Sequence, residues 1–489
     1  MSANGPGIPL PAPGTARRAL GSGGSVHLIG IGGVGMSALA GMLRSRGYRV
    51  RGSDTGVYPP ASLLLQRLGI PVFEGFDPVH LADRPDLVVV GNVATARNPE
   101  VQALLEARLP YVSFPQALRE LFLEGRVPVV VAGTHGKTTS TAMLARVLES
   151  ADRDPSFFVG GHSLDFDTNF RLGRGPLFVV EGDEYDSACF DKRPKFLHYG
   201  ARALLLTAVE FDHADIYRDL EAVGRAFRRL VASLPHDSPL VVCADFPHAL
   251  EVASGRRGET FGFAPSADWR PADVRTGEDG VRFTVVHGGR RVCEIRLALA
   301  GDINVRNALG VFALARRLGL SREEIAAGLA RFRGVARRQE IVGTFGGVTI
   351  VDDFAHHPTA VAGTLRALRA RFPGRRLWAL FEPRSNTSRR RVFQKEYASA
   401  LAPADRVVVA RVPTKPNDPV PPAELFSPEE LVSDLRMRDV PAVAASEVSE
   451  IVELVRREAR PGDVVVLLSN GSFGGLRGLL EAALSGSSA

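Results

Sequence analysis

Apolar residues along the chain gather into short continuous runs, and amphipathic segments separate each run from the next. Continuous apolar runs are typical of strands buried on both faces of a sheet. The predicted strands are 25–30, 49–52, 87–91, 127–131, 177–181, 203–207, 348–352, 376–381, 405–410 and 463–468. The predicted helices are 36–45, 63–68, 101–107, 138–150, 304–318, 322–332 and 359–371. Strands that alternate with helices predict a doubly wound, mostly parallel α/β fold.

The alternation of strands and helices restarts along the chain of 489 residues, which predicts three domains. They are a Rossmann-like domain at 25–124, a central domain at 125–335 and a second Rossmann-like domain at 336–489. In the central domain, 281–286 and 291–297 alternate apolar and polar residues, which predicts an antiparallel hairpin at a sheet edge. Residues 1–24 are rich in Pro, Gly, Ala and Ser and are predicted to form a disordered leader.

The net charge of +6 suggests nucleic-acid binding as one hypothesis. Of the 60 lysines and arginines only five are lysines, and the arginines are scattered among acidic residues. Because no basic stretch is interleaved with aromatic residues, we expect no nucleic-acid partner. The cysteines number three and lie far apart, and no apolar run reaches the length of about 18 residues that a membrane span needs. We therefore expect reduced thiols, no membrane segment and a cytoplasmic protein.

A glycine-rich turn follows the first predicted strand. Gly30, Gly32, Gly33 and Gly35 fit the pattern G-x-G-x-x-G, and Asp54 follows at the end of the next strand. Glycines let the backbone approach a phosphate closely, and the helix that follows offers unpaired N–H groups at its start. The same donors suit the diphosphate of NAD or of a UDP-sugar, so the motif leaves both ligands open, together with a turn that binds nothing.

A second turn, with the sequence AGTHGKTT, follows the strand 127–131. In a phosphate-binding loop, backbone N–H groups cradle the phosphates, a lysine meets the β- and γ-phosphate oxygens, and a hydroxyl ligates Mg²⁺. Lys137 and Thr138 occupy those two positions, whereas Val131 stands where the common pattern has glycine. The central domain is therefore predicted to be P-loop ATPase-like, with ATP and Mg²⁺ as ligands.

Acidic and histidine side chains follow the next two predicted strands. Glu181 opens the segment EGDEYD, and His213 lies within FDHAD. Ligands of parallel sheets collect at the carboxyl ends of strands, and Mg²⁺ prefers oxygen ligands. We therefore expect Glu181 and His213 to be metal ligands near Thr138. A solvent-exposed acidic loop is the alternative interpretation of the EGDEYD segment.

Six segments, in order along the chain, resemble those of the bacterial Mur ligases. They are GIGGVGMSALAGML, AGTHGKTTS, VEGDEYDS, EFDHADIY, GVARRQE and DDFAHHPTA. The resemblance covers nearly the whole chain beyond the leader. It implies a UDP-muramyl-binding domain, a central ATPase domain, and a C-terminal domain that binds peptide and closes over ATP. The first turn would then hold a UDP diphosphate instead of NAD.

The resemblance also implies roles for individual residues. Those that would bind the UDP-sugar are Gly30, Gly32, Gly33, Gly35, Met36, Ser37, Asp54 and Asn92. Those that would bind ATP are Gly133, Thr134, His135, Gly136, Lys137, Thr138, Thr139, Asn304, Asn307, Arg338 and Asp353. Those that would meet the peptide are Arg384, Ser385, Asn386 and Asn470. The metal ligands would be Thr138, Glu181 and His213, and the catalytic residues Lys137, Glu181, His213, Arg338 and His357.

The chain departs from the family pattern at two points. Ile303 stands where the family usually has a histidine beside the adenine-binding asparagines. No lysine occurs between Lys195 and Lys395, so the carbamylated lysine of several relatives is not expected in the central domain. Which of His356 and His357 acts in the site is left open.

Four further segments favour one branch of the family. They are VYPP at 57–60, FDKRPKF at 190–196, FEPRSNT at 381–387 and SNGSFGG at 469–475. This branch implies an ATP-dependent amide ligase of peptidoglycan recycling. Through an acyl phosphate, it would join UDP-N-acetylmuramate to L-alanyl-γ-D-glutamyl-meso-diaminopimelate, a tripeptide derived from muropeptides. The alternative is the biosynthetic branch that adds L-alanine, and an NAD-dependent oxidoreductase is a more distant alternative that leaves GKTT unexplained.

Overall fold

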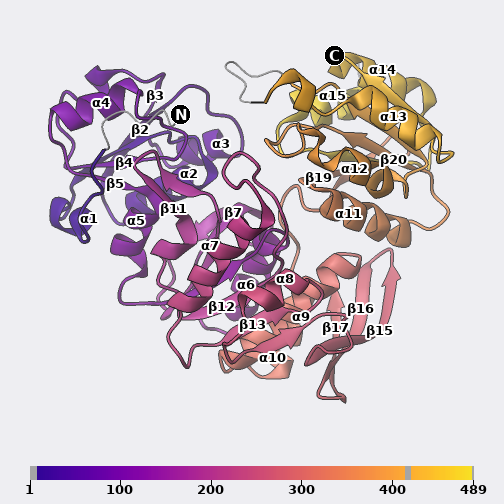
Figure 1. The fold of residues 1–489 in the computed structure, drawn as a ribbon, viewed down its shortest axis with the longest axis horizontal. Helices are drawn as coiled ribbons and strands as arrows, with labels where there is room; N and C mark the ends of the chain where they lie inside the picture. Colours follow the sequence, from indigo (N-terminus) through magenta and orange to yellow (C-terminus); the bar gives the residue numbers. More distant parts are fainter. Residues whose placement is uncertain (1–7, 414–419, 487–489) are drawn as a thin grey trace. The chain divides into compact units, whose positions relative to one another are not determined.

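A computed structural model describes residues 8–413 and 420–486 of the chain (Figure 1). Contacts within the chain divide it into two units. The first unit comprises Met1–Glu210, Glu221–Asp268 and Gly310–Gly328. The second comprises Phe211–Leu220, Trp269–Leu309 and Leu329–Ala489. Each unit contains parallel strands covered by helices.

The first sheet of the first unit is entirely parallel, with the order β3-β2-β1-β4-β5. Its strands are β1 (Ser25–Ile29), β2 (Arg49–Asp54), β3 (Val72–Glu74), β4 (Leu87–Val90) and β5 (Tyr111–Ser113). Its helices are α1 (Thr15–Ala19), α2 (Val34–Ser45), α3 (Ala61–Arg67), α4 (Pro99–Glu106), α5 (Phe114–Leu118), η1 (Pro78–Leu81) and η2 (Arg119–Leu123). Every residue of β4 is buried, as expected for a strand with helices on both faces.

The N-terminal segment is ordered over its described part, which corrects the prediction of a disordered leader. Residues 1–7 lie outside the described residues, but α1 forms at Thr15–Ala19. The backbone amides of Gly14 and Ala16 each donate a 2.7 Å hydrogen bond to the Glu120 carboxylate, and Ala16 is fully buried. The composition gave no sign of this anchor, because its acceptor is more than a hundred residues away.

The second sheet of the first unit has the order β14-β13-β12-β6-β9-β7-β8, with only the β7–β8 pair antiparallel. Its strands are β6 (Val127–Ala132), β7 (Ser156–Ser163), β8 (Thr168–Arg171), β9 (Leu177–Gly182), β12 (Ala203–Leu206), β13 (Leu240–Cys243) and β14 (Glu259–Phe261). A hairpin, β10 (Asp186–Ala188) and β11 (Asp191–Pro194), follows β9. The helical segments of this region are α6 (Lys137–Ser150), η3 (Lys195–His198), α7 (Leu220–Ser233) and α8 (Pro247–Val252). The division between the units falls within α9 (Asp302–Arg317) and α10 (Arg322–Ala330), and residues Gly310–Gly328 belong to the first unit.

The second unit contains an antiparallel meander and a sheet of order β18-β19-β23-β20-β21-β22, parallel except for β18. The meander is β15 (Trp269–Gly277), β16 (Gly280–His287) and β17 (Arg290–Leu297). The sheet strands are β18 (Glu340–Phe345), β19 (Val348–Asp353), β20 (Leu377–Phe381), β21 (Arg406–Ala410), β22 (Ala442–Ala445) and β23 (Val464–Leu468). The helical segments are α11 (Pro358–Arg371), η4 (Arg391–Phe393), α12 (Gln394–Leu401), η5 (Pro422–Glu424), α13 (Pro428–Arg436), α14 (Val448–Glu458), η6 (Phe473–Gly475) and α15 (Leu476–Leu484).

Alternate residues of this sheet face two separate apolar cores, because successive strand side chains point to opposite faces. Leu377, Ala379 and Phe381 of β20 pack with α11, α12 and α13. Trp378 and Leu380 pack on the other face with α14 and α15. The sheet is therefore covered on both sides, as its continuous apolar strands predict.

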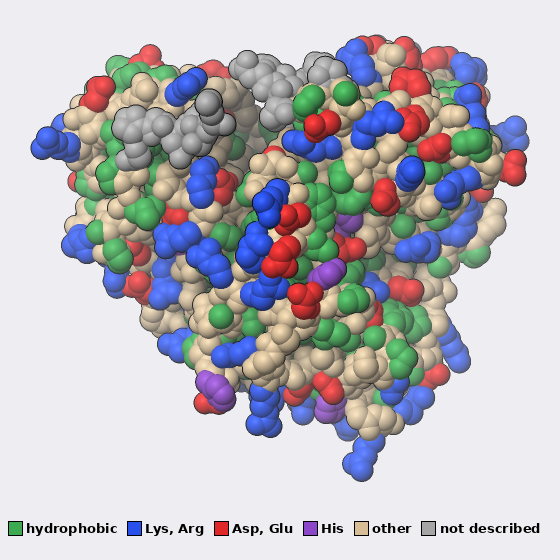
Figure 2. Space-filling view, viewed as in Figure 1, with side chains coloured by type: hydrophobic (Ala, Val, Ile, Leu, Met, Phe, Trp, Pro, Cys, Tyr) green, Lys and Arg blue, Asp and Glu red, His purple; other side chains and the backbone are tan. Residues whose placement is uncertain are grey.

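The α/β, mostly parallel fold class is confirmed, and each predicted strand and helix coincides with an observed element to within a few residues. The domain boundaries stay a prediction. No helix in the described residues is long and apolar enough to cross a membrane. Basic and acidic side chains stand among one another on the face drawn in Figure 2. Many arginines are paired, as in Arg369–Asp405 at 2.6 Å and Arg406–Glu458 at 2.8 Å.

Asp463 joins the start of β23 to β20. Its carboxylate lies 2.6 Å from the Arg376 guanidinium and accepts hydrogen bonds from the Trp378 indole at 3.0 Å and the Arg460 amide at 3.0 Å. Burial opposes ionisation, but these donors hold the pKa of Asp463 below its ordinary value. A carboxylate with a depressed pKa stabilises the folded state above its unfolded pKa and loses that contribution as the pH falls through the folded value.

We predict that Asp463→Asn lowers the midpoint of thermal unfolding at pH 7 by about 5 °C, because hydrogen bonds to a charged acceptor are lost. The difference from the wild type should shrink as the pH falls below about 4, toward the lowered pKa of the folded carboxyl. The matched control is Asp439→Asn, an exposed site. A difference that stays constant between pH 7 and pH 3 would contradict the assignment.

Candidate active site

The second glycine turn joins β6 to α6 in the way that a phosphate-binding loop requires. Gly133 has a φ of 142°, and a Cβ there would lie 2.2 Å from Thr207 Oγ1. Gly136 has a φ of 81° and precedes α6, whose first residue is Lys137. Only glycine adopts these conformations without strain. The loop therefore brings its backbone close to the end of β12 and places the α6 N-terminus at the carboxyl edge of the sheet.

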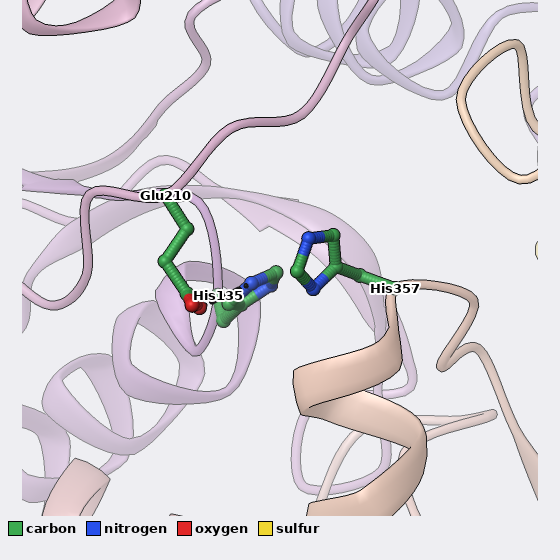
Figure 3. A group of neighbouring side chains, drawn as sticks. All are labelled: His135, Glu210 and His357. Carbon is green, nitrogen blue, oxygen red and sulfur yellow. Dashed lines mark ion pairs between the residues drawn. The ribbon is translucent and has the colours of Figure 1, made fainter. Parts of the chain in front are cut away.

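The residues that follow β12 hold this loop in place. The Thr134 amide donates to the Ala208 carbonyl at 2.8 Å, and the Glu210 amide donates to Thr134 Oγ1 at 3.0 Å. Thr207 Oγ1 donates to the His135 carbonyl at 2.5 Å. The His135 ring lies beside the Glu210 carboxylate, with Nε2 and Oε2 3.0 Å apart (Figure 3). The first amides of α6 have no acceptor within the helix, which makes this position suited to an anion.

Thr138 and Glu181 bring two oxygen atoms together beside the loop. Thr138 Oγ1 donates to Glu181 Oε1 at 2.8 Å, and the Gly160 amide donates to Glu181 Oε2 at 2.6 Å. Both side chains are buried. A hydroxyl and a carboxylate fit a magnesium ion, which takes few protein ligands and keeps its other positions for water and phosphate. The predicted ligand His213 belongs to the second unit and is described with it below.

Lys137 lies within a group of acidic side chains. Its Nζ is 3.2 Å from Glu184, and Asp183 is in turn 2.6 Å from Lys195. Burial opposes the charge on Lys137, but the nearby carboxylates of Glu184, Asp183 and Glu181 outweigh it and raise its pKa. Burial also opposes ionisation of Asp183, yet Lys195 and Lys137 hold its pKa well below the usual range. Lys137 is therefore fully charged at neutral pH.

The first glycine turn joins β1 to α2, and the end of β2 fixes it. The Gly32 amide donates to Asp54 Oδ2 at 2.8 Å, so Asp54 stabilises the turn itself. Met36 and Ser37 are buried, and any contact that they make with a ligand would come from their backbone. Asn92 is exposed beyond the end of β4. The first amides of α2 are available to an anion for the same reason as those of α6.

Four predicted nucleotide-binding residues lie together in the second unit. Asn304 Nδ2 donates to Gln339 Oε1 at 3.3 Å, and the Gln339 amide donates to Asp353 Oδ2 at 2.7 Å. Asn307 lies 3.5 Å from Asn304, and the Arg338 guanidinium stacks over the Phe354 ring. Burial raises the pKa of Asp353, and Arg338 partly opposes that effect. Sequence reasoning missed Gln339, although it stands next to Arg338 in the GVARRQE segment.

Asp212 is the acidic centre of a histidine cluster in the second unit. It accepts a 2.7 Å hydrogen bond from the His213 amide, and the His356 ring lies 3.8 Å from its other oxygen. Burial opposes ionisation of Asp212, but His213, His356 and His357 hold its pKa far below the usual range. Burial lowers the pKa of His356. His213 has a φ of 56°, an uncommon conformation for a histidine.

His357 uses both ring nitrogens in structural contacts. It lies at the start of α11 (Figure 3), where Nδ1 accepts a 3.3 Å hydrogen bond from the Thr359 amide. Nε2 lies 3.2 Å from the Phe211 carbonyl and donates to it. In these two contacts Nδ1 is the acceptor and Nε2 the donor. These contacts give His357 a helix-capping role, and the catalytic role expected from the sequence stays a prediction.

The predicted peptide-binding residues follow the parallel neighbours β20 and β23. Asn386 Nδ2 donates to Asp215 Oδ2 at 2.8 Å, and Ser385 Oγ accepts a 2.9 Å hydrogen bond from the Ser388 amide. A Cβ on Gly471 would overlap the Arg384 guanidinium, so this arginine lies over the segment that contains Asn470. The strand ends thus bring a cation and amide groups to one edge of the sheet.

A glycine loop between a buried parallel strand and a helix, with a charged lysine and a buried hydroxyl–carboxylate pair beside it, is the arrangement expected of a nucleotide-binding enzyme. Family models match three consecutive parts of the chain. Residues 25–126 match the Mur ligase family catalytic domain, 131–315 the Mur ligase middle domain, and 337–471 the Mur ligase glutamate ligase domain. The chain belongs to the Mur ligase family of ATP-dependent ligases that form amide bonds.

Named relatives fall in two branches of the family. The chain is 38% identical to the UDP-N-acetylmuramate–L-alanyl-γ-D-glutamyl-meso-2,6-diaminoheptandioate ligase of Escherichia coli strain K12, over 92% of this chain and 96% of that protein. It is 41% identical to a UDP-N-acetylmuramate–L-alanine ligase of Kineococcus radiotolerans, over 81% and 83% of the two chains.

Solved structures show the same two branches. A murein peptide ligase of Psychrobacter arcticus matches with a TM-score of 0.72 and 33% identity, over 96% of this chain and 100% of that one. A UDP-N-acetylmuramate–alanine ligase of Thermotoga maritima matches with a TM-score of 0.78 and 26% identity, over 95% and 100%.

We predict that Gly133→Ala weakens ATP binding by about tenfold or more, because the added methyl meets Thr207 Oγ1 at 2.2 Å and Ala208 N at 2.7 Å and displaces the loop. Isothermal titration calorimetry with ATP measures this change. Gly277→Ala is the control, since a Cβ there has no atom within 4 Å. Equal ATP affinity in the two variants would contradict the assigned loop.

Proposed function

We propose that the protein joins the lactyl carboxylate of UDP-N-acetylmuramate to the free amine of L-alanyl-γ-D-glutamyl-meso-diaminopimelate, with ATP converted to ADP and phosphate. The observation that carries the proposal is the charged Lys137 at the start of α6, beside the Thr138–Glu181 pair. The relative from Escherichia coli, matched over 92% of the chain, supports this pair of substrates.

The reaction needs an activated carboxyl, because a carboxylate would have to expel oxide to form an amide. Phosphoryl transfer from ATP to the carboxylate gives an acyl phosphate and ADP. The peptide amine then attacks the acyl carbon, loses a proton, and phosphate leaves the tetrahedral intermediate. Lys137 would stabilise the charge on the transferred phosphoryl group, and the α6 amides would hold the phosphate oxygens.

Thr138 and Glu181 would hold Mg²⁺, with His213 as a ligand of a second ion. When bound, Mg²⁺ neutralises charge on the phosphate oxygens and orients them. Glu181 is already fixed by the Gly160 amide, so its second oxygen is presented in one orientation. Lys137 is released from Glu184 when it turns to the phosphate. The carboxylates around Lys137 thus keep its ammonium group charged until the nucleotide binds.

The remaining predicted residues divide the other ligands among three proposed domains. Residues 25–124 would hold the UDP diphosphate at the first glycine turn, and 125–335 the ATP phosphates. Residues 336–489 would contribute Arg338 and Asp353 to ATP. In the same domain Arg384, which lies over Gly471, offers a planar cation to a carboxylate of the acidic peptide.

The branch is decided by substrate choice. Purified protein incubated with ATP, Mg²⁺ and UDP-N-acetylmuramate should form product with the tripeptide, and mass spectrometry identifies that product. We expect little turnover with L-alanine. Exclusive use of L-alanine would replace the proposal by the biosynthetic activity, which the relative from Kineococcus radiotolerans makes the second candidate.

Lys137→Ala should lower the rate of ADP formation by about a hundredfold or more, because a charge that stabilises the transition state is removed. Circular dichroism should show an unchanged fold. Lys192→Ala is the matched control, since this lysine is exposed and pairs only with Asp186 among the described ion pairs. Near-normal turnover of Lys137→Ala would refute the phosphate-loop assignment.

A further inference from the structure

A buried polar cluster lies beside the first glycine turn, and the proposed function does not use it. It consists of His27 in β1, Ser53 in β2, His80 in η1 and Glu100 in α4, and we refer to it as the Glu100 cluster. His27, Ser53 and Glu100 are fully buried, and the His80 side chain is only 13% exposed. Burying a carboxylate in the interior is costly unless it is well hydrogen-bonded.

Both oxygens of Glu100 are held by donors from separate elements. Oε1 accepts from His80 Nδ1 at 2.6 Å and from the Asp77 amide at 3.4 Å. Oε2 accepts from Ser53 Oγ and from His27 Nε2, the latter at 3.3 Å. Burial would raise the pKa of Glu100, but the hydrogen bonds from His27, Ser53 and His80 outweigh it and lower the pKa. Glu100 is thus an ionised acceptor for four donors.

The tautomer of His27 follows from its surroundings. Its Nδ1 is buried and has no hydrogen-bond partner in the described part of the chain. A proton on that nitrogen would be an unsatisfied buried donor, and Nε2 is the ring nitrogen that meets Glu100. His80 stacks on Phe73, with ring centroids 4.4 Å apart, and this contact fixes its orientation. The donors of the cluster therefore all converge on Glu100.

Ser53 connects this cluster to the glycine turn. Its carbonyl accepts hydrogen bonds from the Gly30 amide at 2.9 Å and the Ile31 amide at 3.1 Å. The next residue, Asp54, accepts the Gly32 amide at 2.8 Å. The end of β2 thus binds three consecutive amides of the turn, while the Ser53 hydroxyl is bound to Glu100. Ser53 is thus bound to Glu100 through its hydroxyl and to the turn through its carbonyl.

We propose that Glu100 is a positioning residue for the nucleotide-sugar substrate. It acts through Ser53: the carboxylate fixes the end of β2, β2 fixes the glycine turn, and the turn presents the first amides of α2 to the diphosphate. The inference rests on the proposed function in one respect, that the first turn is the UDP-sugar site. Glu100 itself contacts neither substrate nor ATP in this scheme.

The test is Glu100→Gln, which keeps the shape but replaces one acceptor oxygen by an NH₂ group that faces other donors. We expect the KM for UDP-N-acetylmuramate to rise about tenfold. The loss of one hydrogen bond to a charged group changes the free energy by an amount that corresponds to a factor of about ten or more. The kcat and the KM for ATP should change less than about twofold. Glu106→Gln, an exposed site on the same helix, is the matched control and should match the wild type.

A second variant, Ser53→Ala, removes only the hydroxyl that joins β2 to Glu100 and carries the test if Glu100→Gln does not fold. It should raise the same KM, and the double variant should be no worse than Glu100→Gln alone, because both changes break one connection. A purely structural role would instead raise both KM values together, lower kcat, or leave the KM values unchanged while the unfolding temperature falls. Any of these results would overturn the inference.

Calorimetry of UDP-N-acetylmuramate binding separates this inference from the proposed function. If the wild type binds the nucleotide sugar but ligates neither peptide nor L-alanine, the proposed function fails, and the Kd ratio of Glu100→Gln to Glu106→Gln still tests the inference. The inference about Glu100 would be refuted by an unchanged Kd in Glu100→Gln or by the absence of binding to the wild type.

Discussion

The parallel pairing of β6 with β9 on one side and β12 on the other is the constraint on which the phosphate site depends. The register sets Ala132 opposite Gly182 of β9 and opposite Leu206 of β12, so all three strands end at one level. Their next residues are the glycine loop, the acidic pair Asp183 and Glu184, and the Thr207–Glu210 segment, while Glu181 is the penultimate residue of β9. Parallel strands thereby bring together groups that are far apart in the sequence, and helix amides add an anion site at the same edge.

The pairing of charged side chains then determines how this edge of the sheet can bind a phosphate. A buried ammonium group is stable only beside carboxylates, and Lys137 has Glu184 at 3.2 Å. A phosphate would compete with Glu184 for the same ammonium group, so nucleotide binding would exchange one charged partner of Lys137 for another and leave the lysine paired. Asp183 pairs with Lys195 at 2.6 Å and acts on Lys137 through its charge. Two of the few lysines in the chain therefore lie beside the end of β9, where each forms an ion pair with a carboxylate.

The strands, helices and both glycine turns could be predicted because their signals are local: an apolar run, a glycine at a fixed place, or a lysine before a helix. The residues that contact those motifs could not be predicted from the sequence. Glu184 was seen in an acidic segment but given no role, and Glu100 carries no motif at all. The leader was mispredicted for the same reason, since the Glu120 carboxylate that holds Gly14 and Ala16 is remote in sequence. The role of His357 in catalysis stays a prediction, and its contact with the Phe211 carbonyl, 146 positions away, is one that only the folded chain reveals.

The two glycine turns share one physical solution to the problem of holding an anion. In each, residues at or just beyond the end of a neighbouring strand make the hydrogen bonds that fix its backbone: Ser53 and Asp54 of β2 for the first turn, and Thr207 and Ala208, which follow β12, for the second. The amides at the start of the following helix are left for the ligand. An anion site of this kind needs no cation of its own to be selective, because its geometry is set by neutral backbone groups. The first turn, which lacks a lysine, must therefore depend more strongly than the second on whatever keeps its supporting strand in place.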